Sequence, residues 1–117
     1  MTTEKEKNKS FVYILHCADD TLYTGYTTNV HRRLEEHQAG SKKCKYTMAK
    51  IRRPVVLKQA WEVEGTKGNA LRIEAFIKKL SRIKKNKLIS NPDQLSSLYR
   101  EKSSQDIKCW TIKDVNY

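Results

Sequence analysis

The clearest pattern in the first third of the chain is a pair of short apolar runs with a polar turn between them. The run FVYILH at 11–16 is rich in β-branched and aromatic residues and predicts a buried strand. The segment CADDT interrupts this run with turn formers, and LYTGYT from Leu22 resumes it. Two short strands joined by a few polar residues predict an antiparallel hairpin. The charged residues at 1–10 predict a flexible N-terminal tail.

A helix is predicted directly after the hairpin. Asn29 can cap its first turn, Val30 and Leu34 lie one turn apart, and Gly40 can end it. The basic segment SKKCKYTMAKIRRP follows as a predicted loop that ends at Pro54.

Residues 55–63 alternate between apolar and polar positions, which predicts a half-buried strand. Strict alternation places four apolar residues on one face of this strand: Val55, Leu57, Trp61 and Val63. Lys58 and Glu62 are expected on the opposite face.

The second half of the chain reads as helical. Thr66 can cap a helix with an apolar stripe of Ala70, Ile73, Ile77 and Leu80. Ser81 predicts the start of a second, strongly basic helix, and Asn91-Pro92 predicts a third that runs to about Lys102. The segment IKCWTI near the C-terminus fits either a short strand or a loosely packed tail.

The order of these elements, β-β-α-β-α-α, predicts an α+β domain with a small antiparallel three-stranded sheet flanked by helices. The domain is expected over residues 11–90, and a C-terminal helical extension and tail over 91–117. A chain of 117 residues is long enough for one modest core and short for two. No dimer-forming heptad is present, so a monomer is the default expectation.

Composition narrows the class of partner. The 24 Lys and Arg against 13 Asp and Glu leave a formal net charge of +11, which favours a polyanionic partner such as nucleic acid. The longest apolar stretch, Phe11 to Leu15, is too short to span a bilayer. The three cysteines are scattered and read as reduced thiols of a cytoplasmic protein. A zinc site from His37 and Cys44 is disfavoured because paired ligand spacing is absent.

Three features point to phosphate chemistry. Glu74 borders an apolar stripe, where a carboxylate needs a cation, either Lys78 one turn away or a divalent metal. Arg33 and His37 lie one turn apart on a helix and can reach one phosphate. Gly25, beside Tyr23, removes a side chain where a backbone or a substrate must come close. These features suggest a phosphate-handling site without fixing its reaction.

Several segments in register resemble the GIY-YIG endonucleases. FVY at 11–13 precedes YTG at 23–25 and NVHRRLEEH at 29–37, which is similar to the paired-tyrosine signature of that family. ALRIEAFIKKL at 70–80 is similar to the helix that carries its metal-binding glutamate. The match runs from about Phe11 to Leu88 and is nearest to the small single-domain bacterial branch, in which KYT at 45–47 and RRPVVL at 52–57 also fit.

The resemblance implies an endonuclease that hydrolyses phosphodiester bonds with one Mg²⁺ or Mn²⁺ ion on Glu74. Arg33 would neutralise charge on the phosphoryl oxygens. Tyr13 would be the general base and Tyr23 would orient water or phosphate, although the two roles could be exchanged. Because a free tyrosine has a pKa near 10, either the cation and Arg33 lower that pKa or the proton passes onward during attack. His37 could hydrogen-bond a tyrosine or take part in proton transfer.

Basic residues on the predicted loop and helices would hold backbone phosphates without reading bases. They are Arg32, Lys42, Lys43, Lys45, Arg52, Arg53, Lys78, Arg82, Lys84 and Lys85. DNA is favoured over RNA, with the choice left open. Two alternatives stay beside the nuclease: a nucleic-acid-binding module of the same fold with little or no turnover, and a domain that docks on an acidic protein.

Overall fold

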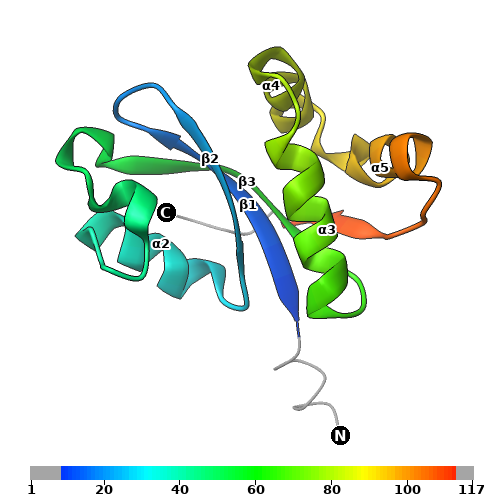
Figure 1. Ribbon diagram of the computed structural model, residues 1–117, viewed down its shortest axis with the longest axis horizontal. Helices are drawn as coiled ribbons and strands as arrows, with labels where there is room; N and C mark the ends of the chain where they lie inside the picture. Colours follow the sequence, from blue (N-terminus) through cyan, green and yellow to red (C-terminus); the bar gives the residue numbers. More distant parts are fainter. Residues whose placement is uncertain (1–8, 113–117) are drawn as a thin grey trace, which may run out of the picture.

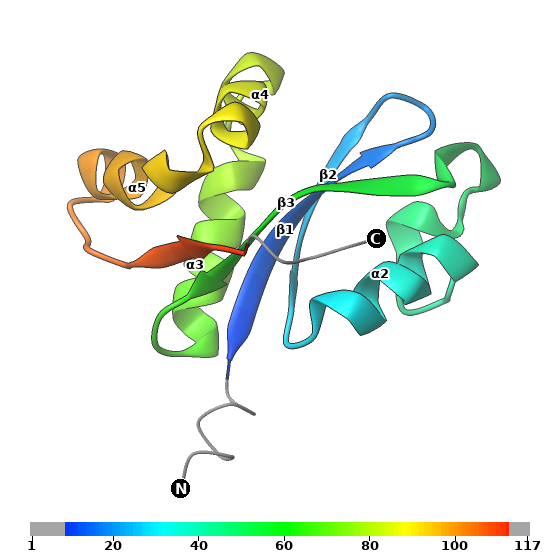
Figure 2. The same cartoon turned by 180° about the vertical axis from the view of Figure 1, so that it is seen from behind.

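The computed structural model describes residues 9–112, which form a four-stranded antiparallel sheet with helices packed on it (Figures 1 and 2). The strands lie in the order β2-β1-β3-β4. Their bounds are Ser10–Cys17 for β1, Leu22–Thr27 for β2, Val55–Val63 for β3 and Cys109–Thr111 for β4. The predicted α+β class is confirmed. Residues 1–8 of the tail expected at 1–10 lie outside the described residues. Its last residue, Ser10, is the first residue of β1.

The expectation of three strands is wrong, because the segment near the C-terminus adds β4 to the sheet. Cys109 pairs with Val63 and Thr111 pairs with Trp61 across the outer edge of β3. The carboxylate of Glu64 accepts the backbone N–H of Lys108 at 3.0 Å, just before β4 begins. A strand this short has no periodicity of its own, so its formation depends on the edge that it joins.

The predicted hairpin of β1 and β2 is confirmed, and its turn is fixed from outside. Asp20 in the turn adopts the left-handed conformation at φ 67°, which Asp tolerates better than most residues. Its carboxylate contacts His16 Nε2 at 2.8 Å and accepts an N–H of Arg82 at 3.1 Å. A second N–H of Arg82 donates to the Asp20 carbonyl at 2.6 Å. The hairpin tip is therefore tied to the start of α4, which spans Arg82–Ser90.

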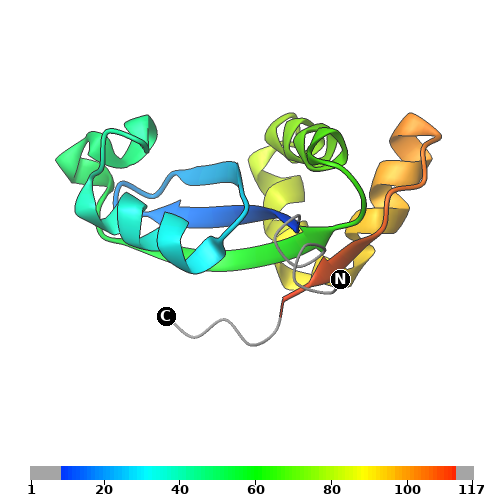
Figure 3. The same cartoon turned by 90° about the horizontal axis from the view of Figure 1, so that it is seen from below.

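Strand β1 divides the core into two clusters, one on each face of the sheet. Val12 and Ile14 face the larger cluster, which includes Ile73 and Ile77 of α3 (Lys67–Lys78). Tyr13, Leu15 and Cys17, which alternate with them, face a smaller cluster under α2 (Val30–Ala39). In Figure 1 the strands run between α2 on the left and α3 on the right, and Figure 3 shows the same helices from below. A strand buried on both faces requires the near-continuous apolar run that the sequence has at this point.

The expectation of strict alternation along β3 is wrong, because the strand contains a bulge. Ile14 pairs with Gln59 but Leu15 pairs with Leu57, so Lys58 is an extra residue. An extra residue exchanges the two faces of a strand for everything beyond it. Val55 and Leu57 therefore pack toward α2, whereas two residues expected beside them, Trp61 and Val63, pack on the opposite face.

The predicted helix caps are confirmed. The side chain of Asn29 accepts the backbone N–H of Arg32 at 3.0 Å, and Gly40 ends α2 with φ 68°. Thr66 accepts from Asn69 at 3.3 Å and Ser81 accepts from Lys84 at 3.2 Å. Within the predicted loop at 41–54 the chain forms two short 3-10 helices, η1 (Lys45–Met48) and η2 (Lys50–Arg52).

The C-terminal extension packs on the same core as the rest of the chain. Pro92 begins a 3-10 turn, η3 (Pro92–Gln94), and α5 follows at Leu95–Ser103, as the Asn91-Pro92 signal predicts. Leu95, Tyr99 and Ile107 are members of the larger core cluster. The indole N–H of Trp61 donates to the carbonyl of Pro92 at 2.9 Å. None of the helices within residues 9–112 has the length and apolar character needed to cross a membrane.

We expect Leu95→Ala to lower the free energy of unfolding by about 2–5 kcal/mol, because Leu95 is completely buried in the larger cluster. The matched control is Leu71→Ala on α3, where the side chain is 41% exposed and the expected loss is within about 0.5 kcal/mol. Urea denaturation followed by circular dichroism measures both. Equal, small losses would show that residues 92–112 do not stabilise the domain.

Candidate active site

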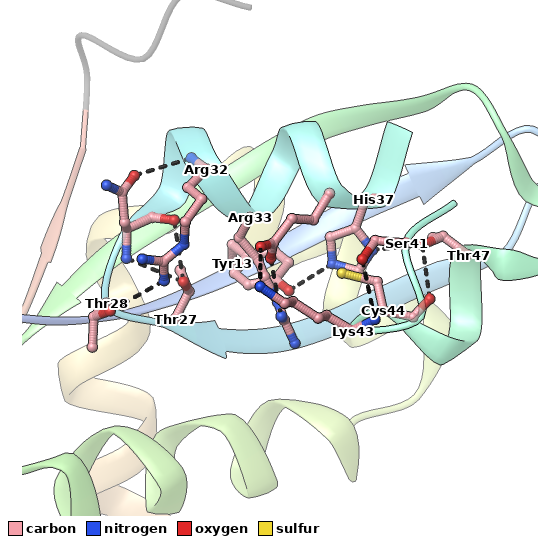
Figure 4. Close-up of polar contacts among 12 residues, drawn as sticks. Tyr13, Thr27, Thr28, Arg32, Arg33, His37, Ser41, Lys43, Cys44 and Thr47 are labelled. Atoms are coloured by element: carbon pink, nitrogen blue, oxygen red, sulfur yellow. Dashed lines mark hydrogen bonds and ion pairs between the residues drawn. The ribbon is translucent and has the colours of Figure 1, made fainter. Parts of the chain in front are cut away.

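A buried chain of hydrogen bonds connects the centre of the sheet with α2 and η1. The hydroxyl of Tyr13 on β1 lies 2.8 Å from Nε2 of His37 on α2. The other ring nitrogen of His37, Nδ1, lies 2.8 Å from Oγ1 of Thr47 on η1. Tyr13 is 2% exposed, and His37 and Thr47 are completely buried. Figure 4 shows Tyr13 and Arg33 on one side of His37, and Cys44 and Thr47 on the other.

His37 is neutral at ordinary pH. Its pKa is lowered from 6.5 to about 4, chiefly by burial and then by the positive charge of Arg33, while Glu36 opposes the shift. The pKa of Tyr13 moves the other way, because burial disfavours the phenolate, although the guanidinium of Arg33 opposes this. The pair is therefore a neutral phenol beside a neutral imidazole.

Gly25 makes room for the Tyr13 side chain. The two residues are directly opposite each other in the pairing of β1 with β2. A Cβ atom at position 25 would collide with the hydroxyl and the ring of Tyr13. The sequence suggested that a backbone or a substrate approaches Gly25, but the group that does so is the side chain of Tyr13, which reaches His37.

Tyr23 is held beside this pair by a stack of rings. Its ring centroid lies 5.0 Å from that of Tyr46, with an interplanar angle of 23°. The guanidinium carbon of Arg52 lies 3.9 Å from the Tyr46 centroid on η1, which is a cation–π distance. The ring of Tyr23 also meets His37 edge-on at 5.4 Å. Burial raises the pKa of Tyr23, and the nearby carboxylate of Glu74 raises it further.

Arg33 lies on α2 one turn before His37, as the spacing predicts. One of its terminal N–H groups donates to Glu36 Oε1 at 3.2 Å, and Glu36 also meets Lys43 at 3.7 Å. The Nε atom of Arg33 is buried and has no acceptor among residues 9–112. The guanidinium is therefore oriented by one carboxylate and keeps donor capacity for a further acceptor.

Glu74 lies on α3 and its charge acts on Tyr23 of β2. Its side chain is 17% exposed, and Oε2 lies 3.5 Å from Nζ of Lys78. The sequence offered two partners for Glu74, Lys78 or a divalent metal. Lys78 does pair with it, but its carboxylate also acts electrostatically on Tyr23, so both interpretations stay open. No group of three His, Cys, Asp or Glu side chains with metal-binding geometry occurs within residues 9–112.

Comparison with models of protein families identifies the family of this chain. The family model described as the GIY-YIG catalytic domain matches residues 9–87, which is most of the described chain. The chain belongs to the GIY-YIG family.

Relatives of this GIY-YIG protein align with it over most of their own length. A UPF0213 protein of Syntrophus aciditrophicus is 48% identical over 89 residues, covering 75% of this chain and 99% of that protein. A UPF0213 protein of Staphylococcus haemolyticus is 52% identical over 81 residues, covering 69% and 94%. A UPF0213 protein of Bacillus halodurans, solved by NMR, is 45% identical with a TM-score of 0.44, covering 70% of this chain and 83% of that one.

The structure uses many of the residues predicted to bind nucleic acid in contacts within this GIY-YIG domain. Arg52 donates to Asp19 at 3.2 Å and to the Tyr46 carbonyl at 3.0 Å. Arg53 donates to the Met48 carbonyl at 3.4 Å. Four more of these basic residues contact side chains of the domain itself: Arg32 with Thr28, Lys43 with Glu36, Lys78 with Glu74 and Arg82 with Asp20. Lys42, Lys45 and Lys84 are exposed, and Lys85 is half-buried.

Thr47 and Tyr46 belong to the site but were not among its predicted residues. They lie in a segment without apolar periodicity, so only the KYT motif at 45–47 could have indicated them. The contact of Thr47 with His37 spans ten residues of sequence and depends on how η1 folds back on α2.

We expect the free energy of unfolding to fall by up to about 3 kcal/mol as the pH drops from 7 to 4, because of His37. Its pKa is about 4 in the folded protein and 6.5 in the unfolded chain, so the unfolded chain binds the proton first and gains stability over that interval. Below pH 4 both states are protonated and this contribution stays lost.

Urea denaturation at a series of pH values measures the effect, with His37→Gln as the control. The variant keeps the other two histidines, His16 and His31, and should show a shallower slope between pH 7 and 4. Parallel slopes for the two proteins would contradict the assignment of this pH dependence to His37.

Proposed function

We propose that the protein is a metal-dependent endonuclease that hydrolyses phosphodiester bonds of nucleic acid. The observation that carries the proposal is the 2.8 Å contact between the Tyr13 hydroxyl and Nε2 of a neutral His37, within a GIY-YIG catalytic domain. This pair can take up a proton from a water molecule. Arg33 lies beside this pair and Glu74 lies near Tyr23, and they supply the charges that phosphate chemistry requires.

Arg33 would bind the scissile phosphate. Its guanidinium is oriented by Glu36 and has an unused buried N–H at Nε. Negative charge grows on the phosphoryl oxygens during attack, so a fixed cation beside them stabilises the transition state more than the ground state. A flexible lysine in this place would lack the planar donor arrangement.

Tyr13 would act as the general base through His37. The oxygen of a water molecule forms a bond to phosphorus while the bond to the leaving oxygen breaks. One proton of the water passes to the Tyr13 oxygen as the Tyr13 proton passes to Nε2 of His37. The leaving oxygen takes a proton from solvent, and His37 later returns its proton to solvent.

The pKa values favour this relay over a preformed phenolate. Burial raises the pKa of Tyr13, so very little phenolate exists at neutral pH. Of the two routes that the sequence left open, the onward transfer of the proton therefore has the stronger support. Arg33 is one of the two causes that lower the pKa of His37, and a bound phosphate would offset its charge. Substrate binding thereby makes His37 a better proton acceptor.

Tyr23 would orient the water or the phosphate. Its ring is fixed between Tyr46 and His37, and its hydroxyl has no hydrogen-bond partner within the described part of the chain. A rigid ring with a free hydroxyl is suited to positioning because little conformational entropy is lost when it binds.

The residues present fit one divalent cation on Glu74. Mg²⁺ commonly takes one or two protein carboxylates and completes its shell with water and substrate phosphate oxygens. Glu74 is a single carboxylate near the tyrosines, and its Lys78 partner is half-exposed and can move away. When bound, Mg²⁺ or Mn²⁺ would polarise the scissile phosphate as a Lewis acid.

The substrate is proposed to be DNA before RNA, held through its phosphates. The formal charge of +11 provides long-range attraction, and several lysines project from the 41–54 segment and from α4.

We expect Glu74→Gln to abolish cleavage while nucleic-acid binding at low salt persists, because the amide removes the charge that would hold the cation. Labelled linear, branched and single-stranded DNA and RNA are compared with Mg²⁺, with Mn²⁺ and with chelator. Glu35→Gln on the exposed side of α2 is the matched control and should cut like the wild type.

Cutting that persists in chelator would contradict the metal dependence. Salt-sensitive binding without cutting by any form would instead favour the nucleic-acid-binding module.

We expect Tyr13→Phe to lower kcat by about 10²- to 10⁴-fold, as removal of a positioned base does. The change deletes one hydroxyl and leaves the ring that packs against Gly25. Tyr26→Phe on the same hairpin is the control, since its ring faces the other core cluster and Lys67. Equal rates for the two variants would exclude Tyr13 as the base.

A further inference from the structure

Thr47 contacts both Nδ1 of His37, the ring nitrogen that faces away from Tyr13, and a backbone carbonyl. Its hydroxyl oxygen lies 2.8 Å from Nδ1 of His37 and donates to the carbonyl of Cys44 at 3.2 Å. The backbone N–H of Thr47 donates to the same carbonyl at 3.1 Å. The side chain is completely buried, so water does not offer an alternative partner.

These contacts favour one direction for the hydrogen bonds that join Thr47, His37 and Tyr13. A hydroxyl has one proton, and a carbonyl can only accept. The Thr47 proton therefore points to Cys44, and a lone pair of its oxygen faces His37. Nδ1 must then carry the hydrogen of the neutral ring, which leaves Nε2 without one. Consequently the Tyr13 hydroxyl donates to Nε2.

The opposite tautomer would disable the relay. With its hydrogen on Nε2, the ring would donate to the Tyr13 oxygen and could not accept the Tyr13 proton. Thr47 would also have to turn its own proton toward Nδ1 and leave the Cys44 carbonyl with one donor fewer. Buried polar groups that lose a partner are costly, so the arrangement around Thr47 disfavours this state.

We propose that Thr47 is a positioning residue that holds His37 in the Nδ1–H tautomer, so that Nε2 accepts the proton of Tyr13. The inference rests on the proposed function for its consequence in catalysis, but the tautomer itself is a property of the folded protein. The Thr47 methyl group contributes too, because branching at Cβ limits the hydroxyl to few rotamers. Its backbone is fixed in η1 by the same carbonyl that takes its proton.

The direct test is the tautomer of His37, read from two-bond ¹H–¹⁵N correlations of the ¹⁵N-labelled protein at pH 7. Wild type is expected to carry the hydrogen on Nδ1. Thr47→Ser keeps the hydroxyl and should show the same pattern. Thr47→Val keeps the shape, removes the acceptor for Nδ1–H and should shift the ring toward the Nε2–H form.

Cleavage provides the second readout. Thr47→Val should lower kcat by at least about tenfold with little change in KM, since the residue orders a proton acceptor and does not contact substrate. Thr47→Ser should restore most of the rate. A merely structural role of Thr47 predicts lost stability without a change of tautomer.

Two results would overturn the proposal: hydrogen on Nε2 in the wild type, or an unchanged tautomer and kcat in Thr47→Val. If Thr47→Val does not fold, the spectra of wild type and Thr47→Ser decide, because both must show Nδ1–H. If the three proteins show the expected tautomers but none of them cleaves nucleic acid, the role of Thr47 in fixing the His37 tautomer is supported and the nuclease function is refuted.

Discussion

The buried hydrogen bond between Tyr13 and His37 is the constraint around which the rest of the domain is arranged. Two polar side chains removed from water require compensation, and each element nearby supplies a part of it. Strand β1 places Tyr13 in the middle of the sheet, and β2 has a glycine opposite it, where a Cβ would collide with the ring. Helix α2 brings His37 down on the same face, and η1 folds back to satisfy its second nitrogen.

Burial also determines how this pair can act. It keeps both groups neutral, because it raises the pKa of the phenol and lowers that of the imidazole. A preformed phenolate or imidazolium is therefore disfavoured, and the chemistry that remains is a shift of protons along existing hydrogen bonds as charge develops nearby. The charged side chains of Arg33 and Glu74 are 26% and 17% exposed, unlike the completely buried His37, which is consistent with the cost of burying charge.

The sequence predicted what depends on local pattern. The hairpin, the caps at Asn29, Thr66 and Ser81, and the helices followed from periodicity and turn chemistry. What it missed depends on pairing between distant segments. The bulge at Lys58 is set by the register of β3 on β1, and β4 forms only because an edge of β3 is open. In the candidate site, helical spacing joined Arg33 to His37, whereas Thr47 reaches His37 through an irregular segment that no period describes.

The distribution of charge adds a distinction that composition could not make. A formal charge of +11 indicated a polyanionic partner and led to ten candidate phosphate contacts. In the folded chain the arginines among them are largely used to fix structure: Arg52 holds the Tyr46 ring and Asp19, and Arg82 holds the hairpin tip. The lysines of the 41–54 segment and of α4 are mostly exposed. Arginine is suited to the first role because its planar fork binds two acceptors at once. Lysines have flexible side chains, which suit contacts to backbone phosphates that do not depend on base sequence. The arginines therefore mainly stabilise the fold, whereas the exposed lysines are available for the proposed substrate.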